Sequence, residues 1–96
     1  MFVTGIFPAT RFNEEDNRFT CEIDLPGIEK SDIQMTYENG QIIVRAVRKL
    51  GEKEEKISRA FYVDKCKDIK ATTKNGVLYI TGEYEKPKSM HITWGD

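Results

Sequence analysis

Hydrophobic and polar residues alternate along most of this chain with the two-residue period of a β-strand that has one buried face. The segments with this period are residues 18–25, 33–38, 41–48, 57–63 and 69–74. The side chains expected on their inner faces include Phe19, Cys21, Ile23, Leu25, Ile42, Val44, Ala46, Ile57 and Val63. We therefore predict a sheet protein whose strands each turn one side toward a core.

The residues IKATTKNGVLYI, from Ile69 to Ile80, form the densest strand pattern. Asn75 and Gly76 both tolerate positive φ, which suits the two-residue type I′ turn of a β-hairpin. Four consecutive apolar residues follow, and such a run indicates a strand that is covered on both faces. We expect this strand to lie inside its sheet. Asn39–Gly40 is a second hairpin signal of the same kind.

The segments between the strands carry turn and loop residues. Residues 50–56 predict a charged loop around Gly51, residues 64–68 predict a turn, and Pro87 is expected to end the sheet. No segment has convincing helical periodicity. Seven or so short strands without helices predict an all-β fold, an antiparallel β-sandwich of immunoglobulin-like architecture.

The chain divides into three parts by composition. Residues 1–11 form a short apolar N-terminal arm, residues 12–88 the β-sandwich domain and residues 89–96 a C-terminal tail. The arm either packs on its own domain or mediates self-association or client contact.

Length and charge limit the function classes. Ninety-six residues make one domain, and 39% hydrophobic with 32% charged residues is ordinary for a soluble protein. No run approaches the roughly 20 apolar residues of a membrane span, and the N-terminus does not resemble a secretion signal. We expect a cytoplasmic protein with no membrane partner. A net charge of −1 gives no overall drive to bind nucleic acid.

Charge is unevenly distributed along the chain. Residues 13–38 contain eight acids and two bases, whereas residues 41–74 contain ten bases and five acids. This asymmetry either reflects solvated strand faces or helps to align subunits and attract charged partners. Arg59 interrupts an otherwise apolar row, so it is expected to pair with an acid at a sheet edge or a subunit contact.

Groups for catalysis or cofactor binding are sparse. The glycines form neither GxGxxG nor GxxxxGK[ST], and His91 is the only histidine. The acids at 14–16 are expected to form a solvated turn, and Cys21 a buried free thiol. We predict no enzyme activity, no cofactor and no metal site.

Two segments carry a family resemblance. Residues 19–48, FTCEIDLPGIEKSDIQMTYENGQIIVRAVR, and residues 57–80, ISRAFYVDKCKDIKATTKNGVLYI, resemble the alpha-crystallin domain of small heat-shock proteins. DLPG and NGVL in this order and at this spacing make the resemblance specific. It implies an ATP-independent holdase that captures partly unfolded protein clients and keeps them soluble, with no cofactor.

The resemblance also implies two interaction sites. One is a client groove between the strand after DLPG and the strand before NGVL, lined by Ile33, Met35, Tyr37, Ile69, Ala71 and Thr73. The alternative is that these residues only complete the sandwich core. The second is a dimer interface on the strand that contains Arg59 and Phe61.

The chain also departs from the family pattern. The connection between Arg48 and Ile57 is too short for the extra strand that bacterial and plant members swap between protomers, and Ile92–Trp94 only approximates the C-terminal Ile-x-Ile motif. We therefore expect a monomer, a homodimer or a small homo-oligomer. Two other functions stay open: a CS-type adaptor that docks onto a folded partner or larger chaperone, and a structural or assembly module.

Overall fold

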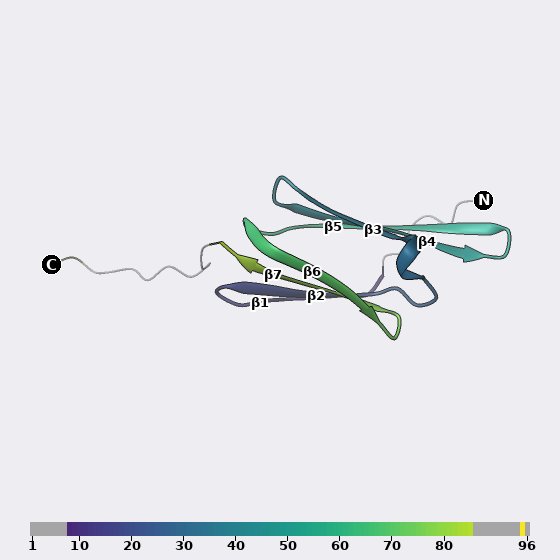
Figure 1. The fold of residues 1–96 in the computed structure, drawn as a ribbon, viewed down its shortest axis with the longest axis horizontal. Helices are drawn as coiled ribbons and strands as arrows, with labels where there is room; N and C mark the ends of the chain where they lie inside the picture. Colours follow the sequence, from purple (N-terminus) through teal and green to yellow (C-terminus); the bar gives the residue numbers. More distant parts are fainter. Residues whose placement is uncertain (1–7, 86–94, 96) are drawn as a thin grey trace.

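The protein is a sandwich of two antiparallel sheets in this computed structural model, which describes residues 8–85 and residue 95 (Figure 1). The elements are β1 (Thr10–Glu14), β2 (Arg18–Asp24), the 3-10 turn η1 (Lys30–Asp32), β3 (Ile33–Glu38), β4 (Gln41–Leu50), β5 (Lys53–Tyr62), β6 (Cys66–Lys74) and β7 (Val77–Tyr84). One sheet has the strand order β1–β2–β7–β6 and the other the order β3–β4–β5. This architecture confirms the predicted all-β sandwich.

The core lies between the two sheets and is built from the inner faces that the alternation predicted. Its buried side chains are Phe19, Cys21, Ile23, Leu25, Ile42, Val44, Ala46, Ile57, Val63, Cys66, Leu78, Ile80 and Tyr84. Full burial of one large apolar side chain contributes about 1.5–3 kcal/mol to folding. The central strands β2, β4 and β7 supply most of these side chains, so they hold the sandwich together.

Both predicted Asn-Gly turns are present. Asn39 and Gly40 have φ values of 52° and 73°, and Asn75 and Gly76 have φ values of 52° and 77°. Two consecutive residues with positive φ are the mark of a type I′ turn. The second turn leads into β7, which pairs with β2 on one side and β6 on the other, so its predicted place inside the sheet is confirmed. The predicted cover on both faces is wrong, because only alternate residues of β7 are buried and the outer face meets solvent.

The predicted charged loop at residues 50–56 is wrong. β4 runs to Leu50, β5 begins at Lys53, and only residues 51 and 52 form the turn. Arg48 and Glu55 face each other in this ladder and form an ion pair, with Glu55 only 3% exposed. Charged residues therefore occupy inward positions here, and they conceal the alternation of a strand.

The predicted turn at residues 64–68 is also partly wrong. β6 already begins at Cys66, and its pairing with β7 shifts register between Lys67 and Lys70. Asp68 lies in this irregular region with a φ of 54°. A β-bulge changes the phase of the side chains, so a two-residue period does not continue through it.

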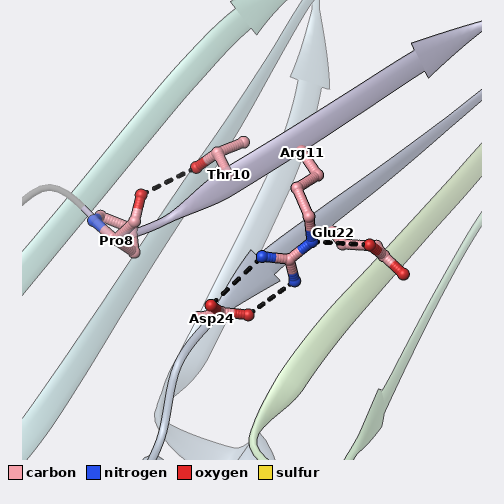
Figure 2. Close-up of polar contacts among 5 residues, drawn as sticks. All are labelled: Pro8, Thr10, Arg11, Glu22 and Asp24. Carbon is pink, nitrogen blue, oxygen red and sulfur yellow. Dashed lines mark hydrogen bonds and ion pairs between the residues drawn. The ribbon is translucent and has the colours of Figure 1, made fainter.

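β1 forms an edge of the four-stranded sheet and begins inside the predicted arm. Arg11 is fixed to β2: its Nε donates to Glu22 Oε2 at 2.8 Å, and its terminal nitrogens donate to both carboxylate oxygens of Asp24 at 2.7 and 3.2 Å (Figure 2). These bonds hold the start of β1 on the sheet. The rest of the predicted arm up to Phe7 lies outside the described residues, and so does the tail except for Gly95.

Candidate functional site

The edge strand of each sheet lies beside an edge strand of the other. β3 ends the three-stranded sheet and β6 ends the four-stranded sheet. A hydrogen bond links them, because the backbone N–H of Cys66 donates to Tyr37 Oη at 3.2 Å. The side of the sandwich between β3 and β6 is the place where the family resemblance implies a client groove.

A cavity of about 150 Å³ opens between these strands, and we call it the β3–β6 groove. Its lining side chains are Ile33 and Met35 from β3, Ala71 and Thr73 from β6, Leu78 from β7 and Lys30 from η1. A second hollow of about 110 Å³ shares Ile33, Thr73 and Leu78 with the groove and reaches Leu25, Ile28 and residues 74–77. The groove therefore continues past the start of β3 toward the turn between β6 and β7.

Small side chains on β6 leave the groove open. Ala71 pairs with Ile80 and Thr73 with Leu78, so both point toward the space between the sheets. They are too short to fill it, and both remain exposed. Across the groove, Ile33 is half-buried and packs against the core. The result is an apolar surface that water can reach.

The structure brings four of the six predicted groove residues into one cavity. The other two lie nearby without lining it. Ile69 packs against the core, and the Tyr37 side chain, 38% exposed, accepts the hydrogen bond from the Cys66 backbone N–H that links β3 to β6. Sequence reasoning missed Lys30 and Leu78. Lys30 lies in a 3-10 turn that has no strand period, and Leu78 belongs to β7, whereas the resemblance implies groove residues only on β3 and β6.

The second predicted site lies on β5, the other edge of the three-stranded sheet. Phe61 packs edge-on against Phe12 from β1, with ring centroids 5.7 Å apart, and against Phe19 at 6.3 Å. Arg59 is half-buried and forms no ion pair within residues 8–85. Its charge lies close to Cys21, where burial raises the pKa of the thiol to about 11 while Arg59 acts in the opposite direction.

Other reactive groups are few in the described part of the chain. The Cys66 thiol donates to the Asp64 carbonyl at 2.8 Å, and burial raises its pKa, assisted by the negative charges of Asp64 and Glu85. Among residues 8–85 and 95, no three histidine, cysteine or acidic side chains come together as metal ligands. Over the same residues, no helix has the length and apolar character to cross a membrane.

Comparisons with known proteins agree on one family. A sequence profile of the Hsp20/alpha crystallin family matches residues 11–93. The 18 kDa heat shock protein of Clostridium acetobutylicum is 32% identical over 106 residues, which covers 83% of this chain and 70% of that protein. The heat shock protein HSP.16.4 of Streptococcus thermophilus is 32% identical over 88 residues. The match covers 75% of this chain and 62% of the Streptococcus protein.

A solved structure shows the same fold. Heat shock protein 16.0 from Schizosaccharomyces pombe superimposes with a TM-score of 0.77 over 96% of this chain and 98% of that chain, at 20% sequence identity. At this identity the likeness concerns the arrangement of the strands. It covers both sheets and therefore the two edges that form the β3–β6 groove.

Proposed function

Because this chain belongs to the Hsp20/alpha crystallin family of small heat shock proteins, which are chaperones rather than a class of enzymes, we propose that it holds partly unfolded proteins without ATP and keeps them soluble. The observation that carries this proposal is the β3–β6 groove, an open apolar surface between two sheet edges. A partly unfolded client exposes apolar side chains and unpaired backbone groups, and this surface offers partners for both.

The groove suits extended client segments of varied sequence. Alternate side chains of an extended strand point to the same side, so every second client residue would face Ile33 and Met35. The flexible thioether of Met35 adapts to side chains of different shape. Burial of apolar surface supplies the driving force at about 25 cal/mol per Å², so capture requires no nucleotide.

Light scattering of a heat-aggregating model client tests the proposal directly. The client is heated alone and with increasing amounts of this protein, in buffer that contains no nucleotide. We expect suppression of the scattering that grows with the molar ratio. Full aggregation at several-fold molar excess of this protein would overturn the holdase function.

A matched pair of variants on β6 tests the groove itself. Ala71 faces the groove, whereas Thr72, the next residue, pairs with Tyr79 and faces the opposite side of the sheet. Both are exposed, so aspartate at either position leaves the core intact. We expect Ala71→Asp to lose most of the suppression and Thr72→Asp to retain it. Equal activity of the two variants would place client capture elsewhere.

We also propose that β5 forms a homodimer interface. β5 is unpaired on one side within the described residues, and Arg59 has no acid partner there, which favours an ion pair with a second subunit. Sedimentation analysis should give a dimer for the wild type and a smaller species for Arg59→Glu. Lys49→Glu, an exposed change on β4, serves as the charge control. Unchanged assembly of Arg59→Glu would contradict this interface.

A cytoplasmic location is part of the same proposal. Cys21 and Cys66 are both buried and free, which fits a reducing compartment. Cell fractionation with antibody detection should recover the protein in the cytosolic fraction, and recovery in a membrane or exported fraction would contradict it.

A further inference from the structure

Two charged side chains of the described residues line the β3–β6 groove and the hollow that continues from it, and both are lysines. Lys30 lines the groove and Lys74 lines the hollow. No acid among residues 8–85 lines either cavity. Neither lysine forms an ion pair within the part of the chain that the structure describes. The apolar surface therefore borders two positive charges that no neighbouring carboxylate neutralises by contact.

Both lysines lie at the same end of the groove. Lys30 is in η1, immediately before β3, and Lys74 is the last residue of β6. Ile33, the first residue of β3, and Thr73 line both cavities, which places the start of β3 beside the end of β6. At the other end, Tyr37 bonds to the backbone of Cys66 and joins the two edges. The groove thus has one basic, open end and one closed end.

Acidic neighbours of Lys30 do not change this arrangement. Glu29 immediately precedes η1 and Asp32 is its last residue, and the Asp32 N–H donates to the Glu29 carbonyl at 2.9 Å. Neither side chain lines the groove or the hollow. On β6, Lys67 and Lys70 also precede Lys74, and Asp68 is the single acid of the strand. The electrostatic potential at the open end is therefore positive beside β6. Beside η1, the two acids reduce it only partly.

We infer that the β3–β6 groove selects extended segments whose apolar side chains are followed, on one side, by acidic residues that contact Lys30 and Lys74. This selection rests on the proposed client function and names the chemistry of the preferred client. An exposed ion pair strengthens binding by about two- to fivefold at low ionic strength. Because such attraction is screened by salt, the preference should weaken as ionic strength rises.

Synthetic peptides provide the test. Four short fluorescent peptides contain two valines separated by one threonine and differ only in their flanks: neutral, aspartates on the N-terminal side, aspartates on the C-terminal side, and lysines on both sides. Fluorescence anisotropy measures their dissociation constants with the full chain. We expect one of the two acidic peptides to bind about three- to tenfold more tightly than the neutral peptide at low salt, and the lysine peptide to bind less tightly.

Charge-reversal variants identify the groups responsible. Lys30 and Lys74 are exposed, so Lys30→Glu with Lys74→Glu alters the charge without entering the core. Lys49→Glu on β4 is the control, because Lys49 is also exposed but lines neither cavity. The double variant should abolish the preference for the acidic peptide and the control should keep it. Equal affinity for all four peptides, an equal gain from both acidic flanks, or a preference that survives the double variant would overturn the inference. Failure of every peptide to bind would instead overturn the groove as a client site.

Discussion

Phe19 and Gly82 lie directly opposite each other on β2 and β7, and the aromatic ring occupies the space that a side chain at position 82 would fill. A Cβ atom on Gly82 would lie 2.4 Å from Phe19 Cε1 and 2.8 Å from Cζ. The ring cannot easily move away, because Phe12, Phe61 and Tyr84 surround it with centroid distances of 5.7–6.3 Å. Gly82 is thus required by packing.

We predict that Gly82→Ala lowers the free energy of unfolding by about 1–3 kcal/mol, the usual cost of an overpacked core. Urea denaturation followed by circular dichroism measures this change. The control combines Gly82→Ala with Phe19→Leu, which removes the ring atoms that clash. The double variant should lose less stability than the sum of the losses in the two single variants, because the smaller leucine leaves space for the new methyl group. Strict additivity would contradict the proposed clash.

The turn glycines Gly76 and Gly51 allow a second comparison. Both have positive φ, 77° and 65°, but only Gly76 lies against another segment: a Cβ there would be 3.3 Å from Pro26 Cα. Alanine at Gly51 should cost about 1–2 kcal/mol from the left-handed backbone alone. Alanine at Gly76 should cost more, since Pro26 must also shift. If the urea midpoint falls equally for both variants, the contact with Pro26 contributes nothing to the loss of stability.

The sequence predicted most strands because each of them has one buried face. β2, β3 and β4 follow the alternation closely, β7 is indicated by its apolar run, and the Asn-Gly turns before β4 and β7 adopt the expected backbone. The prediction failed where the inward residue is charged or where the strand pairing is irregular. Arg48 and Glu55 occupy inward positions as an ion pair, and the irregular pairing around Asp68 shifts the phase of β6. Neither feature leaves a hydrophobic period that a reader of the sequence could detect.

The candidate site was harder to predict than the fold. The family resemblance placed β3 and β6 beside each other, and Ile33, Met35, Ala71 and Thr73 do share one cavity. The alternation cannot reveal how far one strand is displaced along the other, because that offset depends on how the two sheets cross. Lys30 lines the groove for a related reason: its position depends on the 3-10 turn that connects the two sheets.

The Arg11 ion pairs predict a pH dependence of stability. The hydrogen bonds from Arg11 hold the pKa of Asp24 below its ordinary value of 3.8. A carboxyl group with a lowered pKa in the folded state stabilises the protein above its ordinary pKa, and this contribution disappears as the pH falls through the folded-state value. Asp24→Asn should therefore be less stable than wild type at pH 7, and the difference should shrink below pH 3.8.

Thermal unfolding from pH 7 to pH 2 checks this dependence. The Arg11→Met background is the control, because it removes the donor that lowers the pKa of Asp24. In that background, Asp24→Asn should have little effect at any pH. A stability difference that stays constant from pH 7 to pH 2 in the native background would contradict the role of the Arg11 bonds.

The Arg48–Glu55 pair gives the last prediction, because its two members differ in their access to water. The Glu55 side chain is only 4% exposed, whereas that of Arg48 is 24% exposed and also donates to the Pro26 carbonyl at 3.2 Å. Arg48→Met leaves a buried carboxylate without its partner, which costs about 3–5 kcal/mol. Glu55→Leu leaves an arginine that keeps its bond to Pro26 and reaches solvent, so it should cost clearly less.

The double variant distinguishes two costs: the loss of the attraction between Arg48 and Glu55, and the burial of one charge without its partner. Arg48→Met with Glu55→Leu removes both charges and also the Arg48 Nε, which is buried and has no hydrogen-bond partner among residues 8–85. Replacing a buried ion pair by apolar side chains is often neutral or stabilising, so the double variant should be more stable than Arg48→Met alone. Urea denaturation of the three variants gives the ranking. Arg48→Met that is no less stable than Glu55→Leu would contradict this ranking. It would mean that the end of the β4–β5 hairpin opens without loss of the core and lets water reach the Glu55 carboxylate.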